Sequence, residues 1–163
     1  LQAQSLGVRV CLLRLGVVLD SGGGALSEMS KSFKLGVASW LGSGQQWLSW
    51  VHRSDVVRAM LFLLQREDLQ GPFNITSPAP TTSRGFAAAL QSHYRTFIRA
   101  AVPAPVIRLL VGEMAQELLL SGQRVVPERL QEAGFDFTYP TIEAALAAIH
   151  ADQTTLRTRS ASG

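Results

Sequence analysis

The side chains with the clearest capacity for chemistry gather in residues 40–55, which read WLGSGQQWLSWVHRSD. This segment holds all three tryptophans of the chain, two glutamines and one of its three histidines. Indole rings and side-chain amides suit a polar ligand, because the ring is apolar with one polar edge and the amide both donates and accepts hydrogen bonds. The same residues also suit a local core beside a glycine turn. Both interpretations stay open on composition alone.

Two of the tryptophans, Trp47 and Trp50, lie in a segment with the alternation of a β-strand. Residues 47–51 have the pattern of a strand, in which alternate side chains face opposite sides. Trp47 and Trp50 then point in opposite directions, and only one of these faces can line a cleft. We interpret Trp50 as a core residue. Trp47, which follows Gln45 and Gln46, is the better candidate for a ligand contact.

Other catalytic patterns are missing from the chain. The glycines after Ser21 lack the G-x-G-x-x-G spacing and the lysine of a phosphate-binding loop, so we interpret them as a flexible turn. The histidines stand far apart in the sequence, and Cys11 is the single cysteine, so no zinc pattern exists. No nucleophile elbow surrounds Ser43. Glu113 and Glu117 lie one helical turn apart, which is typical of a solvated face. The residues by themselves predict no catalytic group.

Composition excludes several classes of protein. The 163 residues are 47% hydrophobic, enough for a buried core in one domain or in part of a larger one. The net charge is +3 and the arginines are scattered singly, which argues against nucleic-acid binding. One cysteine allows no internal disulfide and fits a reducing, cytoplasmic compartment. No apolar run reaches the roughly 18 residues of a membrane span, and no signal peptide begins the chain. Leu1 opens a segment that reads as mid-sequence, so we expect a fragment or a processed product.

A strand, helix and strand order positions the tryptophan segment. Val8–Leu13 is a nearly continuous apolar run, which predicts a strand buried on both faces, as in a parallel sheet. Phe73–Thr76 predicts a second strand. A helix follows the glycine turn and ends near Gly36, and another begins at Ser54, which we expect to be its N-cap. The apolar face expected to point inward on this second helix comprises Val56, Val57, Met60, Leu61 and Leu64.

The second half of the chain reads as mostly helical. Apolar spacing, caps and prolines predict, in order, a helix capped by Thr82 or Ser83, a short strand at 98–102, and helices at about 106–120, 127–134 and 141–150. The last residues, 151–163, are rich in threonine, arginine, serine and glycine. We expect this tail to be disordered.

Several of these segments resemble a known family. The runs LLRLGVVLDSGGGALSEM, LGSGQQWLSWVHRSDV and GPFNITSPAP follow one another as in the second half of extended short-chain dehydrogenases/reductases. The block from Val102 to Leu146 resembles the C-terminal domain, DUF1731, that is specific to a family of NAD(P)-dependent epimerases. The resemblance extends from about Gly7 to Ile149.

The resemblance implies a fold and a division into domains. We expect the C-terminal part of a Rossmann-like, doubly wound parallel sheet plus a small, mostly helical substrate-side domain. Residues 1–80 would end the NAD(P)-binding domain, with a substrate loop inserted at 36–52, and residues 81–150 would form the family-specific domain. In such proteins the glycine-rich motif and Tyr-x-x-x-Lys lie upstream, and this chain has no Tyr-x-x-x-Lys. NAD or NADP would be held mainly by that N-terminal half, and this chain alone would be inactive.

The resemblance also implies site residues. The backbone at Leu15, Gly16 and Val17 would lie by the nicotinamide end of the cofactor. A small, sugar-like substrate would be contacted by Gly44, Gln45, Gln46, Trp47 and His52. Sugar-nucleotide enzymes carry an arginine for the diphosphate where this chain has Leu48, and leucine cannot neutralise a phosphate. An alternative function is therefore a non-catalytic binding or regulatory protein that retains the fold.

Overall fold

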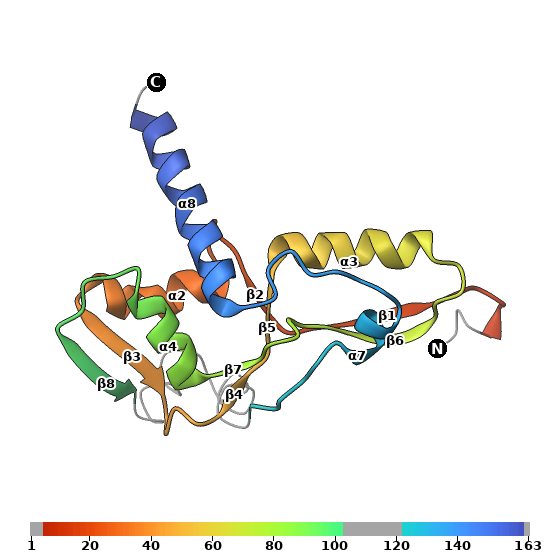
Figure 1. Cartoon of the computed structure of the whole chain (residues 1–163), viewed down its shortest axis with the longest axis horizontal. Coiled ribbons are helices and arrows are strands. Elements are labelled where there is room, and N and C mark those ends of the chain that lie inside the picture. The colour runs from red at the N-terminus through yellow and green to blue at the C-terminus, as the bar shows by residue number, and fades with distance from the viewer. Residues whose placement is uncertain (1–4, 103–121, 162–163) are drawn as a thin grey trace.

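The computed structural model describes residues 5–102 and 122–161, and its strands pair two by two. Figure 1 shows the arrangement. In chain order the elements are β1 (Cys11–Leu15), β2 (Val17–Leu19), α2 (Gly24–Lys34), β3 (Val37–Leu41), β4 (Trp47–Leu48), β5 (Trp50–His52), α3 (Arg53–Gln65), β6 (Gly71–Ile75), β7 (Thr81–Thr82), α4 (Ser83–Gln91), β8 (Ile98–Val102), α7 (Glu128–Glu132) and α8 (Ile142–Ala161). Three of the strand pairs are parallel, as expected for a mixed α/β fold, and β4 with β7 is antiparallel.

Two lobes lie on either side of the β2–β5 pair (Figure 1). We call them the α3 lobe, made of β1, β6, α3 and α7, and the α4 lobe, made of α2, β3, β8, α4 and α8. Each has its own cluster of buried apolar side chains. The segment from Leu48 to Val51 serves both, because Leu48 and Trp50 belong to the cluster of the α4 lobe and Val51 to that of the α3 lobe. The alternation of a strand thus feeds two cores from one short segment.

The α3 lobe contains both strands predicted from the sequence near residues 8–13 and 73–76. β1 pairs with β6 in parallel, from Cys11 opposite Gly71 to Leu15 opposite Ile75. Leu13 packs against the buried cluster, whereas Leu12 and Leu15 are 37% and 54% exposed. The prediction of a strand buried on both faces is therefore wrong for the described residues. The reason is that a single layer, containing α3, covers one face of this strand pair.

Helix α3 corrects a second expectation. Ala59 and Leu63 are buried against the sheet, with Val56 partly buried beside them. Four of the five residues predicted to point inward are instead about half exposed or more: Val57, Met60, Leu61 and Leu64. Apolar residues occupy both sides of this helix, so periodicity could not select the packed face. The N-cap is His52 rather than Ser54, since the His52 ring accepts the hydrogen bond from the Ser54 N–H.

The α4 lobe follows the sequence predictions closely. Helix α2 ends as expected before Gly36, whose φ of 83° is open mainly to glycine. Thr82 caps α4 by accepting from the Gly85 N–H, and the strand expected at 98–102 is β8, paired with β3. The helix predicted at 106–120 lies outside the described residues. The tail expected to be disordered continues α8 to Ala161, because adding residues to a helix that has already formed requires no new nucleation.

Each of the two buried clusters contains residues from both predicted domains, 1–80 and 81–150. Phe33 and Phe86, which lie on opposite sides of residue 80, share the cluster of the α4 lobe. Phe73 and Leu130 likewise share the cluster of the α3 lobe. The chain therefore passes between the lobes more than once, and the division into domains at residue 80 stays a prediction. None of the described helices combines the length and the hydropathy that crossing a membrane requires.

Candidate functional site

Three segments of the chain meet at Gly16, where the first strand changes its partner. Up to Leu15 the strand pairs with β6, and from Val17 onward it pairs with β5. The Gly16 N–H donates to the Ile75 carbonyl at 3.1 Å. A β-carbon at this position would lie 2.6 Å from the carbonyl oxygen of Ser49, so the close approach of the two backbones requires glycine.

A cleft of about 670 Å³ opens at this junction. It lies at the carboxyl ends of β1 and β6, and ligands of open parallel α/β sheets bind at such ends, where the strand order changes. The residues that line it are Arg14, Leu15, Gly16, Val17, Trp47, Leu48, Ser49, Asn74, Thr76, Gly122, Gln123 and Val125. The three residues predicted to lie by the nicotinamide and the tryptophan predicted for the cleft thus share one cavity.

The two strand tryptophans have different environments. Trp50 has no exposed surface and donates from Nε1 to the Ala79 carbonyl at 3.2 Å, so its interpretation as a core residue is confirmed. Trp47 is 38% exposed and lines the cleft. The Arg124 guanidinium lies 5.4 Å from the centre of its indole ring, within the range of a cation–π contact.

Residues 122–126 form another wall of the cleft, and three polar side chains hold this segment. Ser49 Oγ donates to the Gln123 carbonyl at 2.8 Å and accepts from the Val125 N–H at 2.9 Å. Asn74 donates to the Val126 carbonyl, and Thr76 to that of Val125. Sequence reasoning did not single out these three. The available signal was the polar residues that alternate with apolar ones towards the end of the predicted strand at 73–76.

The other residues of the predicted substrate loop lie outside this cleft. Gly44 is buried with a φ of 77°, and a β-carbon there would lie 2.7 Å from the Trp40 ring. Gln46 donates to the Leu41 carbonyl at 2.6 Å and so closes the turn after β3, while Gln45 is exposed. The structure therefore joins Trp47 to the Leu15–Val17 segment, and it separates Trp47 from the residues just before it.

His52 is buried at the start of α3. Its Nδ1 accepts from the Ser54 N–H at 3.1 Å, and the centre of its ring lies 4.0 Å from that of Tyr139. Burial lowers the pKa of His52, and the charges of nearby aspartates, Asp55 first, oppose that shift. A neutral ring with its proton on Nε2 fits this arrangement, because the Nδ1 lone pair must stay free to accept. In this position His52 caps a helix and does not line the cleft.

Asp55 is a buried carboxylate that sequence analysis did not single out. It has no exposed surface and accepts from the backbone N–H groups of Thr138 and Tyr139, each at 2.9 Å. Arg58 completes the site with an ion pair at 3.0 Å. These contacts tie the segment before α8 to the first turn of α3 and satisfy the buried charge.

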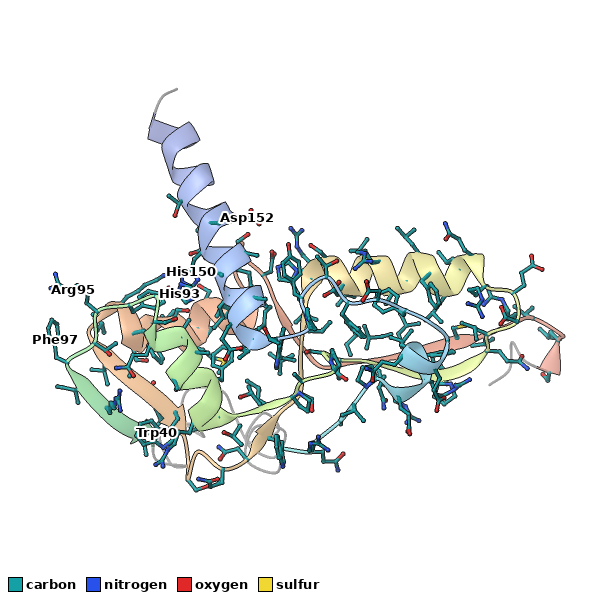
Figure 2. The ribbon with its side chains drawn as sticks, viewed as in Figure 1. Trp40, His93, Arg95, Phe97, His150 and Asp152 are labelled. Carbon is teal, nitrogen blue, oxygen red and sulfur yellow. The ribbon has the colours of Figure 1, made fainter. Side chains whose placement is uncertain are left out.

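A second polar cluster lies where the end of α4 meets the middle of α8. The rings of His93 and His150 stack with centres 4.2 Å apart. Figure 2 labels the two side chains next to each other. Burial, followed by the proximity of His150, lowers the pKa of His93. His150 Nδ1 lies 2.8 Å from the Leu146 carbonyl and must be the donor, which leaves a buried Nε2 without a hydrogen-bond partner among the described residues. The residues that the structure describes contain no group of three or more metal-ligating side chains.

The lining of the main cleft limits what the chain can do chemically. Its side chains include no aspartate, glutamate, histidine, lysine, cysteine or tyrosine. Within the described residues, the cleft can therefore bind and orient a ligand, but it contributes no side chain that gives or takes a proton near neutral pH.

Two family models match the chain. Residues 1–76 match the NAD dependent epimerase/dehydratase family, and residues 102–149 match a domain of unknown function, DUF1731. Among curated proteins, the chain is 42% identical over 144 residues to the epimerase family protein Mb2239 of Mycobacterium bovis, covering 88% of this chain and 48% of that protein. It is 38% identical over 149 residues to the epimerase family protein SAR0825 of Staphylococcus aureus, again over 48% of that protein.

A solved structure agrees with these matches. The human epimerase family protein SDR39U1, crystallised with NADPH, superposes with a TM-score of 0.80 at 33% identity, over 87% of this chain and 48% of that one. The chain thus spans about half the length of the relatives that it matches.

Proposed function

We propose that this chain is the C-terminal part of a protein of the NAD dependent epimerase/dehydratase family, and that it forms the substrate-side wall of an NAD(P)-dependent epimerase or oxidoreductase. The substrate would be a small molecule. Support comes from the family match over residues 1–76 and from relatives about half of whose length the chain spans. The observation that supports this most strongly is the cleft at Gly16. Leu15, Gly16, Val17 and Trp47 line one cavity at the carboxyl ends of two parallel strands.

The residues present fit one end of a nicotinamide dinucleotide. Leu15 and Val17 offer apolar surface for a flat ring, and Asn74 and Gln123 carry amides at the same cavity. When bound, the nicotinamide would supply a hydride or accept one. The pyrophosphate and adenosine would need a glycine-rich loop that this chain lacks, so we assign this chain only the nicotinamide end.

The residues of the chain have distinct roles in this proposal. The exposed part of Trp47 would contact both the nicotinamide beside Leu15–Val17 and the ring of the substrate, and the Arg124 guanidinium would hold the indole in place. Ser49 and Thr76 keep the wall at residues 122–126 closed over the cleft. This wall would exclude water from the reacting atoms. A proton donor or acceptor would have to come from outside the lining described above.

The α3 lobe would bind the N-terminal half that the relatives carry. Its strand pair leaves Leu12 and Leu15 exposed, and α3 leaves four apolar side chains about half exposed or more. A parallel strand normally has a neighbour on each edge and a helical layer on each face. We propose that the missing layer belongs to the dinucleotide-binding half, and that the assembled protein works in the cytoplasm.

The test uses the complete product of the gene that encodes this chain, titrated with NADPH and NADH. In ¹⁵N–¹H spectra, we expect the indole N–H resonance of Trp47 to shift on binding and that of Trp50 to stay, since Trp50 is buried and bonded to Ala79. Trp47→Ala should weaken binding about ten-fold, a typical cost of truncating a well-packed aromatic contact. Trp40→Phe, in the α4 lobe, serves as the matched control. Cofactor binding with an unchanged Trp47 resonance and unchanged affinity in Trp47→Ala would remove Trp47 from the site.

A second candidate function is a binding or regulatory protein without catalysis. The observation in its favour is the cleft lining, which contains no titratable acid or base apart from an arginine. The two candidates differ in the complete protein, because only the enzyme needs a tyrosine and lysine pair facing Gly16. If the gene product binds NADPH but lacks that pair, the non-catalytic function is favoured.

A further inference from the structure

The arginines of the chain fall into two groups according to their contacts. Five of the ten arginines whose side chains the structure describes have a polar structural partner. Arg9 donates to the Leu63 and Leu69 carbonyls, and Arg129 donates to the Pro72 and Gln70 carbonyls. Arg53, Arg58 and Arg66 pair with aspartates. The donors of these five side chains are therefore already engaged by the protein.

The other five arginines have no side-chain hydrogen bond or ion pair to a described residue: Arg14, Arg84, Arg95, Arg99 and Arg124. Of these, only Arg14 and Arg124 lie at the main cleft or in the hollow beside it. Arg14 lines the main cleft and has no hydrogen bond or ion pair to any described residue. Arg124 has no hydrogen bond or ion pair to any described residue, and its guanidinium lies 5.4 Å from the centre of the Trp47 ring. Both side chains are exposed, so within the described part of the chain their donors are available to a ligand.

Arg14 and Arg124 share one groove. A second hollow of about 430 Å³ lies beside the cleft, and both cavities are lined by Arg14, Asn74 and Val125. Arg124 lines this second hollow and also stands against Trp47, so it connects the two. The strand register places Arg14 directly opposite Asn74 on the sheet. The groove is therefore a single basic surface that runs past the exposed indole.

Carboxylates are scarce along this groove. The main cleft has none, and the second hollow has Glu128 alone. Uncompensated arginines in a cleft with apolar walls raise the local concentration of anions and bind carboxylate or phosphate in a two-pronged geometry. The nearby indole adds affinity for a ring or another flat apolar group.

From this arrangement we propose that the substrate of the cleft is a small anion with a carboxylate or phosphate group, which Arg14 and Arg124 bind, joined to a ring that packs on Trp47. This inference rests on the proposed function, because it names the class of molecule that the same cleft would accept. Leu48, the position where sugar-nucleotide enzymes carry an arginine, is buried in the core of the α4 lobe. In this proposal Arg14 and Arg124, on a different wall, bind the anionic group instead.

The test measures dissociation constants of the complete gene product for three probes of similar size: benzoate, phenyl phosphate and benzamide. Calorimetric titrations are run with and without saturating NADPH. We expect at least one of the two anions to bind about ten-fold or more tightly than neutral benzamide, as charge-assisted hydrogen bonds allow. Whichever anion binds better identifies the headgroup as carboxylate or phosphate. Raising the salt concentration should weaken binding of the anions and leave benzamide unaffected.

Two variants test the named residues. Arg14→Met and Arg124→Met should each weaken binding of the preferred anion about ten-fold, and Arg14→Lys should retain part of the affinity because it keeps the charge. Arg99→Met, on β8 of the α4 lobe, is the matched control and should bind as the wild type does. Thermal melts of all four variants check that each is folded.

The outcomes separate this inference from the proposed function. Benzamide binding as tightly as the anions, or unchanged affinity in both arginine-to-methionine variants, overturns the anionic substrate. If none of the probes binds while NADPH still shifts the Trp47 resonance, the anion inference fails and the proposed function stands. If NADPH leaves Trp47 unaffected as well, both fail.

Discussion

The two lobes differ in how completely they enclose their cores. In the α4 lobe, α2 and α4 both pack on β3, and α8 packs on α4, so residues such as Leu90 and Leu146 have no exposed surface. Among the side chains that the structure describes, the large exposed apolar ones of this lobe are Leu35, Phe97 and Ile98, at one end. The α3 lobe leaves one side of its helix and one side of β1 exposed. The comparison indicates that the α4 lobe is a closed unit and that the α3 lobe requires a further layer.

The largest expected effect is in the closed core. Leu90→Ala should lower the free energy of unfolding by about 2–5 kcal/mol, because the side chain has no exposed surface and the lobe cannot collapse around the cavity. Leu64→Ala, on the exposed side of α3, is the matched control and should have little effect in this chain. Urea denaturation of the 163-residue chain measures both. Equal losses in the two variants would contradict the difference between the lobes.

The Asp55 site should rank next. Asp55→Ala should destabilise the chain by about 3 kcal/mol, since it leaves the Arg58 charge and two backbone N–H groups without their shared acceptor. The N–H groups of Thr138 and Tyr139 should also exchange faster with deuterium than in the wild type. Asp68→Ala, which removes an exposed ion pair on the same lobe, should cost far less than Asp55→Ala. A loss in Asp68→Ala as large as that in Asp55→Ala would mean that burial is not what makes this contact important.

The open side of the α3 lobe should govern self-association of the isolated chain. Leu61→Gln combined with Leu64→Gln removes two adjacent apolar side chains that are 52% and 68% exposed, so light scattering should show less aggregation than in the wild type. In the complete gene product the same pair should reduce stability, because the proposed layer would cover these positions. Unchanged stability of the complete product would indicate that this side of α3 stays exposed there.

The smallest expected effect is a pH dependence centred on His93 in the α4 lobe. Burial and the nearby His150 lower the pKa of His93 from 6.5, so the folded chain takes up a proton less readily than the unfolded one. Stability from this source is complete above about pH 6.5 and declines as the pH falls through the lowered pKa. His93→Gln should weaken this decline, measured by urea denaturation between pH 5 and pH 8. Burial also lowers the pKa of His52, so the pH dependence that remains in His93→Gln should come from His52.

Local patterns were sufficient for most of the elements. The parallel strands at Cys11–Leu15 and Gly71–Ile75, helix α2 with Gly36 after it, and the Thr82 cap of α4 all follow from hydrophobic runs and capping residues. Such signals depend on a few neighbouring residues, and the folded chain leaves them unchanged. The opposite directions of Trp47 and Trp50 likewise follow from the two-residue period of a strand.

Only the tertiary structure decided which face each element buries and which residues form the site. Helix α3 is apolar on both sides, so its packed face depends on where the sheet lies and not on its own sequence. The cleft joins Gly16, Ser49 and Gly122, which come from three distant segments and meet only because the first strand changes partner at Gly16. Sequence alone therefore determined most of the elements, their order and the two tryptophan faces. Packing of distant segments determined that Trp47 joins Leu15–Val17 and that His52 caps a helix, because such contacts carry no local signature.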